Sequence, residues 1–241
     1  MPYYPYYYGF DWTYLVLVLP CLILSMWASA RVNSTFKRYA KQISSQHITG
    51  AEAAMRVLRA GGVYNVRIER VAGNLTDHYD PKANVIRLSD SVYDSPSTAA
   101  IGVACHEAGH AIQYAEHYGP IKFRAAIIPI TNIGTKIAMP LILIGILVSA
   151  LGYFSTAIVY LGIACFGLSF VFQLVTLPVE FNASRRALEA IDAAEILTDD
   201  ERRGAKKTLS AAAMTYVAAA ATAFAQLLRL VLLFGRRNNR R

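Results

Sequence analysis

The stretch Cys105-His106-Glu107-Ala108-Gly109-His110-Ala111 says most about the architecture and chemistry of this chain. The apolar residues around it predict a helix. Histidines at positions i and i+4 lie on one helix face about a turn apart, so both imidazoles can reach one zinc ion at roughly 2.1 Å. Glu107 lies close enough to accept a proton from a metal-bound water without being a ligand. The pattern predicts a zinc site with His106 and His110 as ligands and Glu107 as general base.

Gly109 is the unusual residue of this motif, because it lies in the middle of the predicted helix. Glycine there costs about 1 kcal/mol relative to alanine. A position at which another segment must approach the helix backbone closely would explain that cost. The residues before the motif, Ile101, Val103 and Ala104, are apolar and predict a buried face. This context favours a packed metal-binding helix over a chance match on a helix surface.

A catalytic zinc site needs a third protein ligand and leaves the fourth position to water. Glu180 is one candidate, since it directly follows an apolar segment and opens a predicted helix. A carboxylate at such a boundary can equally be a solvated or capping group. His47, His78, His117 and the other acidic residues are alternatives, so the residue types alone leave the third ligand open.

The composition predicts a membrane protein. Hydrophobic residues make up 55% of the chain, charged residues only 17%, and the mean hydropathy is +0.33, whereas soluble domains carry about 25% charged residues. The apolar residues gather in blocks long enough to cross a bilayer about 30 Å thick. These blocks cover residues 14–30, 137–154, 157–177 and 211–234. The last contains Gln226 and Arg229, so it is either a fourth span or a helix packed at the interface.

The tyrosine-rich start of the chain, residues 1–11, contains no basic residue and does not resemble a cleavable signal peptide. It predicts an interfacial anchor before a first span that is retained. The three cysteines are scattered and form no CxxC pair, which argues against a disulfide framework or a cysteine metal site.

The net charge of +8 comes largely from basic residues beside the apolar blocks, which indicates membrane orientation rather than nucleic-acid binding. Thirteen Lys or Arg fall in residues 31–136 and six in 180–210. The middle two apolar blocks predict a helical hairpin with its link near Ser155, which places both segments on one side. The positive-inside rule makes that side cytoplasmic in a multi-pass cell-membrane protein. The arginines after residue 235 resist this assignment if the fourth block spans.

Local sequence patterns predict several caps and strands, and together with the apolar blocks they divide the chain into five segments. Thr49 and Glu52 predict a capping box, Val66–Val71 and Val85–Leu88 predict short strands, and Ser95 or Ser97 can cap the motif helix. The predicted segments are an anchor with the first span (1–30), a catalytic domain carrying the motif (31–128), a transmembrane hairpin (129–178), a third-ligand helix with a charged segment (179–210), and a C-terminal apolar helix with a basic tail (211–241).

Several of these segments together resemble a known family. They are Leu75–Pro81, Val85–Ser89, His106–Gln113 and Leu177–Ala187. This combination is similar to the YugP-like neutral membrane zinc metallopeptidases, which are related to the HtpX and CAAX prenyl protease group of gluzincins. The apolar blocks and this resemblance together predict a predominantly α-helical integral membrane protein with three to four transmembrane helices and a small α+β zincin-like domain. The resemblance also implies Zn²⁺ as cofactor and Glu180 as its third ligand.

The chain departs from the HtpX-like pattern at one position. That pattern has an acid four residues after the ligand glutamate, where this chain has Ser184. An acid there could orient a ligand histidine. Ser184 could form a hydrogen bond but supplies no charge, and Asn182 or Asp77 are the candidates to compensate.

Other polar residues have two interpretations each. Arg185, Arg186, His78 and Tyr114 could stabilise the oxyanion of a tetrahedral intermediate, although basic residues after a span also signal topology. Asp77, His78 and Asp80 could form a second metal cluster, or an Asp-Pro turn could explain them. The strand Val85–Ser89 could pair with an extended substrate along an exposed edge, or belong to a structural hairpin.

The predicted function is a membrane-embedded zinc metalloendopeptidase acting on protein or peptide substrates in or near the bilayer. One alternative is a site-2-type intramembrane protease, but the chain lacks the L-D-G sequence of that class. The other is a non-catalytic zinc-binding membrane scaffold, which would have no need of Glu107 as a base.

Overall fold

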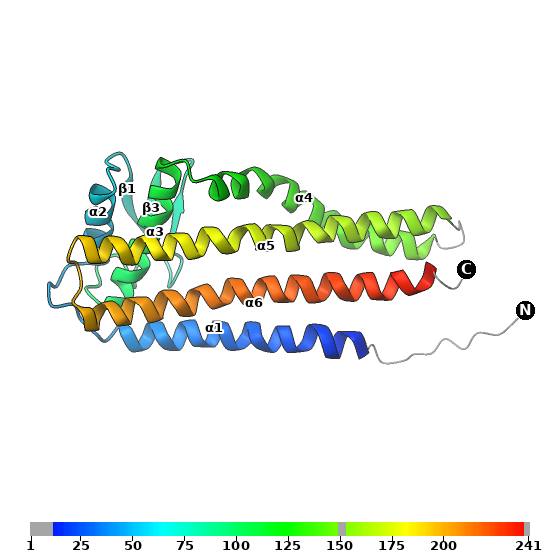
Figure 1. Ribbon diagram of the computed structural model, residues 1–241, viewed down its shortest axis with the longest axis horizontal. Helices are drawn as coiled ribbons and strands as arrows, with labels where there is room; N and C mark the ends of the chain where they lie inside the picture. Colours follow the sequence, from blue (N-terminus) through cyan, green and yellow to red (C-terminus); the bar gives the residue numbers. More distant parts are fainter. Residues whose placement is uncertain (1–11, 149–152, 239–241) are drawn as a thin grey trace, which may run out of the picture.

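Long helices extend from a small α+β head in the computed structural model, which describes residues 12–148 and 153–238 (Figure 1). The predicted tyrosine anchor lies outside the described residues. The elements in chain order are η1 (Tyr14–Val18, a π-helical turn), α1 (Leu19–Tyr39), α2 (Gly50–Ala60), β1 (Arg67–Val71), β2 (His78–Asp80), β3 (Val85–Ser89), α3 (Thr98–Ala115), α4 (Gly119–Leu147), α5 (Tyr153–Ala193) and α6 (Asp199–Asn238).

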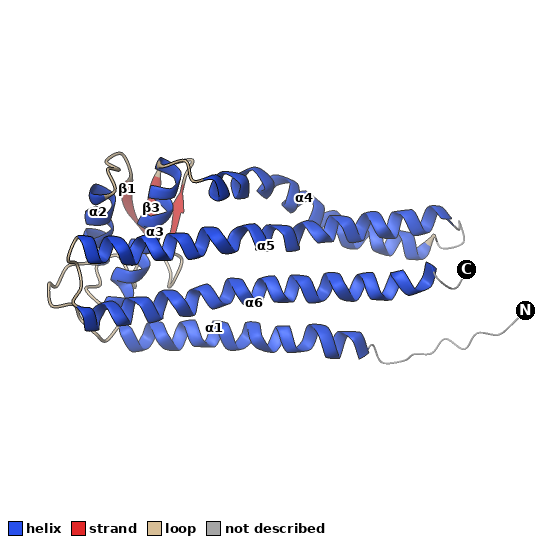
Figure 2. Ribbon diagram, in the orientation of Figure 1, coloured by secondary structure: helices blue, strands red, loops and turns tan. Residues whose placement is uncertain are grey.

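Four helices are long and apolar enough to cross a membrane. They cover Tyr14–Tyr39, Gly119–Leu147, Phe154–Ala193 and Asp199–Gly235. Many of their large apolar side chains face outward, including Ile23 at 58% exposure and Leu161 at 56%, as expected for helices surrounded by lipid. The mostly helical fold with a small sheet and four candidate spans confirms the predicted fold class (Figure 2).

The second and third spans pack closely as a hairpin. A Cβ added at Gly145 would lie 2.9 Å from the Ser155 carbonyl oxygen, and one at Gly162 would lie 2.9 Å from the Ala138 carbonyl oxygen, so small residues allow the helix backbones to approach. Ser155 itself lies inside α5, so the link precedes its predicted position. Hydropathy could not place the link because the apolar run is nearly uniform there.

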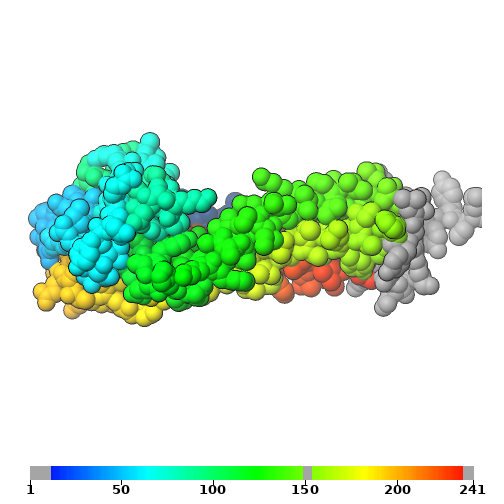
Figure 3. Space-filling view, turned by 90° about the horizontal axis from the view of Figure 1, so that it is seen from above, coloured from blue at the N-terminus to red at the C-terminus, as the bar shows by residue number. Residues whose placement is uncertain are grey.

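Long helices also cross the predicted segment boundaries. The boundaries at 128/129, 178/179 and 210/211 fall inside α4, α5 and α6 respectively. Figure 3 shows α4 leaving the head and crossing to lie along α5. A helix that leaves the membrane does not have to break where its hydropathy changes, because its backbone hydrogen bonds continue. The part of α5 that carries Glu180 is therefore rigidly continuous with a span.

The head contains a three-stranded sheet in the order β1-β3-β2, with β1 parallel and β2 antiparallel to β3. The Thr49–Glu52 capping box at the start of α2 and the Ser97 cap of α3 are both present. The β2 strand was not predicted. Because β3 is the central strand, the prediction of an exposed edge at Val85–Ser89 is wrong, and the open edge on this side of the sheet belongs to β2.

The head and the ends of the long helices share one hydrophobic core. Ile86 of β3 and Ile101 of α3 are fully buried with Ile191 of α5 and Ala205 of α6. Each fully buried isoleucine side chain stabilises the fold by about 1.5–3 kcal/mol. This shared core fixes the position of α5 and α6 relative to the motif helix.

Candidate metal centre

A glycine lets two helices meet at the predicted metal site. A Cβ added at Gly109 of α3 would lie 2.7 Å from the carbonyl oxygen of Ala183 in α5, closer than real Cβ atoms come to such an atom. The absence of a side chain at Gly109 therefore allows the backbones of α3 and α5 to approach. This contact accounts for the glycine in the middle of the HEAGH helix and places Glu180 beside its histidines.

His106, His110 and Glu180 form one compact group whose candidate ligand atoms all lie within 4.8 Å of one another. The Nε2 atoms of His106 and His110 lie 3.3 and 3.5 Å from the same oxygen, Glu180 Oε2. That oxygen is buried and has no hydrogen-bond partner. A buried carboxylate oxygen without a donor is costly, and a cation between it and the two imidazoles would satisfy it. The donor set of two imidazoles and one carboxylate fits zinc.

His110 is oriented by a glutamine that the sequence did not single out as a site residue. The Gln113 amide donates hydrogen bonds to the Val179 carbonyl at 2.9 Å and to Asn182 Oδ1 at 2.8 Å. Its oxygen must therefore face His110 Nδ1, 3.0 Å away, and accept a hydrogen bond from the Nδ1–H group. This arrangement leaves the lone pair of His110 Nε2 directed at the cluster, as a zinc ligand requires.

The electrostatics of His110 also suit a cation. Burial alone would lower the pKa of His110, but its close contact with Glu180 and the charges of Glu107 and Glu180 outweigh burial, and the pKa is raised. The two carboxylates therefore draw positive charge to this point.

His106 is contacted by the residue that departs from the HtpX-like pattern. The Ser184 hydroxyl lies 3.1 Å from His106 Nδ1. Neither of the two residues expected to compensate makes this contact. Asn182 Oδ1 accepts from Gln113 and Arg186, and Asp77 accepts from the backbone N–H and hydroxyl of Ser89. Burial raises the pKa of Asp77, only partly offset by those Ser89 bonds, and the Glu107 charge raises it further.

Arg124 was counted in the sequence only as a topology signal. It reaches from α4 to Glu180, where its guanidinium donates to Oε1 at 2.8 Å. Because Arg124 holds one carboxylate oxygen, the other oxygen faces the histidines. Arg124 directly precedes the uncharged run 125–135, and a basic residue at that boundary was the signal that could have identified it.

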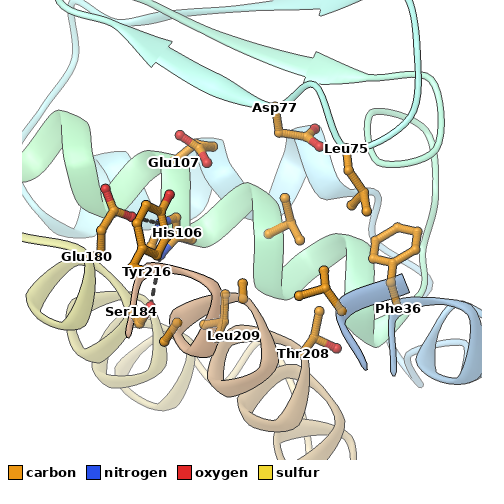
Figure 4. Close-up of a pocket in the computed structure, with 14 residues that line it drawn as sticks. Phe36, Leu75, Asp77, His106, Glu107, Glu180, Ser184, Thr208, Leu209 and Tyr216 are labelled. Atoms are coloured by element: carbon orange, nitrogen blue, oxygen red, sulfur yellow. Dashed lines mark hydrogen bonds and ion pairs between the residues drawn. The ribbon is translucent and has the colours of Figure 1, made fainter. Parts of the chain in front are cut away.

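Two pockets meet at Glu107, which is only 8% exposed. The first, of about 200 Å³, has an apolar wall that includes Phe36 of α1 and Leu209 of α6 (Figure 4). The second, of about 320 Å³, is bordered by β2, α3 and α4. The residues that line both pockets are Asp77, His106, Glu107, Glu180 and Tyr216. The two pockets therefore form a path that passes the His-His-Glu cluster.

Tyr216 of α6 lies beside Glu180 and His106 in this path (Figure 4). The sequence does not mark it as a site residue, because a tyrosine in an alanine-rich block suggests packing or an interface. A phenol within an otherwise apolar span was the available signal.

The other residues that the sequence suggested for the site lie in different parts of the structure. His78 and Tyr114 line the second pocket, and His78 Nδ1 lies 2.8 Å from the Thr76 carbonyl. Arg185 is paired with Glu189 on the exposed side of α5, so the structure does not bring it to the cluster. Asp80 accepts from the backbone of the following turn and pairs with Arg87, which supports the turn interpretation over a second metal cluster.

Arg186 also lies away from the cluster, where it pairs with Glu116. The motif helix α3 is not among the four candidate spans.

A His-His-Glu cluster on a helical scaffold with four candidate spans defines a membrane zinc metallopeptidase. The chain belongs to the family described as "Putative neutral zinc metallopeptidase", which matches residues 14–235. It is 45% identical over 221 residues to the "Putative membrane protease YugP" of Bacillus subtilis (strain 168), an alignment that covers 92% of this chain and 96% of the relative. No solved structure matches the chain significantly.

Proposed function

We propose that this metallopeptidase is an endopeptidase that cuts membrane or membrane-proximal proteins, with His106, His110 and Glu180 as zinc ligands and Glu107 as general base. The observation that carries this proposal is the buried, unpartnered Glu180 Oε2 facing both histidine Nε2 atoms. Zinc held there would supply Lewis-acid chemistry, lowering the pKa of a bound water and polarising a carbonyl.

The residues around the cluster then divide the reaction between them. Glu107 takes a proton from the attacking water and later passes it to the leaving amine. It is suited to this because it lines both pockets and lies next to a ligand without belonging to the ligand group. Tyr216 and His78, which border the path, are placed to donate to the oxyanion.

The two pockets suit an extended peptide. The edge of β2 lies beside the second pocket, where His78 and Tyr79 line the wall, so a substrate strand can pair with it through backbone hydrogen bonds. The apolar wall of the first pocket comes partly from α1 and α6, two candidate spans. A site built in this way favours an apolar side chain near the scissile bond and a substrate close to the bilayer.

We place the site on the cytoplasmic side, because the basic residues gather in the segments at the head end of the helices. In a variant without native cysteines, cysteines introduced at Lys41 and Arg203 should react with a membrane-impermeant reagent from the same side. Labelling from opposite sides would contradict the hairpin and the shared location.

The test of the proposal is to compare bound zinc and hydrolysis in the purified protein, with fluorescently labelled casein as the probe. Glu107→Gln should retain about one zinc and lose turnover, whereas His106→Ala should lose both. Glu189→Gln, on the exposed side of α5, is the matched control and should behave as the parent. If Glu107→Gln cleaves as fast as the parent, the general-base assignment is wrong. A parent that binds zinc without any hydrolysis would favour the scaffold alternative.

A further inference from the structure

A basic groove lies between α1 and α6, on a different face of this helix pair from the apolar pocket. Its lining includes Trp27, Arg31, Arg38 and Tyr39 from α1 and Lys207 from α6, and its volume is about 440 Å³. The apolar pocket uses Val32 and Phe36 of α1 instead. None of the groove residues belongs to the peptidase site, so the groove has no role in the proposed reaction.

The groove lies where the apolar part of both helices ends. Residues 14–30 carry no charge, and Arg31 is the first charged residue of α1. Trp27 is 46% exposed one helical turn before Arg31, and tryptophan is enriched where membranes meet water. Ile23, one further turn into the apolar part, is 58% exposed. The surface therefore changes from apolar to aromatic to cationic along one face, in the order of a phospholipid from its acyl chains to its headgroup.

The cations of the groove converge without an acidic partner. The Arg38 guanidinium and the Lys207 ammonium lie 5.6 and 6.0 Å from the centre of the same Tyr39 ring. The Arg31 guanidinium lies 5.1 Å from the Trp27 ring. Within residues 12–148 and 153–238, none of the three forms an ion pair with a carboxylate. Like charges that approach one ring repel each other, and an anion between them would remove that repulsion.

We propose that the basic groove binds the phosphate headgroup of an anionic phospholipid, with the acyl chains along the apolar surface beyond Trp27. The groove continues towards the head past Lys41 and Arg203, where Asp200 lies near Arg203. That single acid is already engaged, so the groove keeps an excess of positive charge. A free phosphate would use the same cations, but it would gain nothing from the exposed Trp27 and Ile23.

Quenching of Trp27 by brominated lipids tests the proposal in the full-length protein. The chain has two tryptophans, so a Trp12→Phe background leaves Trp27 as the sole reporter. In phosphatidylcholine vesicles, a small fraction of brominated phosphatidylglycerol should quench Trp27 more than the same fraction of brominated phosphatidylcholine. Arg38→Gln and Lys207→Gln should each weaken this preference by about fivefold, since one basic residue near an anionic surface contributes about that factor. Arg38→Lys should preserve it.

The matched control is the double variant Lys37→Gln/Lys206→Gln, which removes two charges from the same helices at neighbouring positions outside the groove. It should keep the preference that Arg38→Gln/Lys207→Gln loses. If both double variants lose it equally, the effect is diffuse surface charge and the proposed groove is wrong. Inorganic phosphate at millimolar concentration should not restore the fluorescence; full restoration would identify a free-phosphate site and overturn the lipid assignment.

Discussion

The two parts of the His-His-Glu cluster are held in different ways. His106 and His110 lie on α3, a short helix inside the core of the head, and their second ring nitrogens contact Ser184 and Gln113. Glu180 lies on α5, a 41-residue helix most of which is a candidate span, and Arg124 of α4 holds its other oxygen. The head alone supplies two of the three candidate zinc ligands, so the complete set depends on the register between α3 and the long helices α4 and α5.

The largest effect on zinc binding should come from removing Glu180, the proposed zinc ligand on α5. Glu180→Ala should lose zinc to a chelator and abolish hydrolysis, with expression and membrane insertion intact. Its loss of zinc affinity should exceed the roughly 10–100-fold that changes next to ligands cause. Glu180→Asp should be intermediate, because the shortened side chain misplaces its oxygen while metal–ligand distances tolerate roughly 0.2 Å.

Glu189→Ala on the same helix is the control and should behave as the parent. Full zinc and near-normal activity in Glu180→Ala would mean that the third ligand lies elsewhere, and His78 and Asp77 would become the next candidates.

The contact between α3 and α5 can be disturbed without changing any of the three proposed zinc ligands. Helix propensity alone predicts that Gly109→Ala stabilises the protein by about 1 kcal/mol. The clash with the Ala183 carbonyl predicts destabilisation instead, by about 1–3 kcal/mol, together with weaker zinc retention. Thermal unfolding in detergent shows whether Gly109→Ala stabilises or destabilises the protein.

Gly167→Ala provides the comparison, because a Cβ there meets only Leu227 at 3.8 Å or more and the helix should be stabilised. If Gly109→Ala is as stabilising as Gly167→Ala, the two helices do not require the close approach.

The next largest effect on zinc affinity should come from removing Gln113, the hydrogen-bond partner of His110. Gln113→Leu removes the amide oxygen that accepts from Nδ1 and leaves Asn182 without one of its donors. We expect zinc affinity to fall by about 10–100-fold while Glu107-dependent turnover of the zinc-loaded enzyme remains measurable. Competition with a chelator at fixed zinc gives the affinity, and unchanged affinity would show that Gln113 only packs between the helices.

The smallest effect should come from Ser184→Ala. The hydroxyl carries no charge, so its contact with His106 should contribute less than the amide contact to His110. We expect a decrease in zinc affinity below tenfold in the same competition measurement. A decrease larger than that of Gln113→Leu would reverse the proposed order of the two supports.

The sequence predicts the structure of some regions of this molecule better than that of others. Uncharged blocks of sufficient length identified the membrane class and the candidate spans, because crossing a bilayer constrains composition directly. The capping box and the Ser97 cap follow from local hydrogen bonding, and both are present. The β2 strand and the central position of β3 were not predictable in this way, because strand order depends on contacts between distant segments.

The sequence by itself determined the family, the zinc chemistry and the helical spacing of His106, Glu107 and His110, since these depend on residue type and on the geometry of one helix. Only the tertiary structure decided what surrounds that helix. Arg124 and Tyr216 come from α4 and α6, and they meet Glu180 beside α3 because Gly109 and the shared core let these helices approach. Such neighbours leave no fixed spacing in the sequence, because packing between helices imposes no constant separation along the chain.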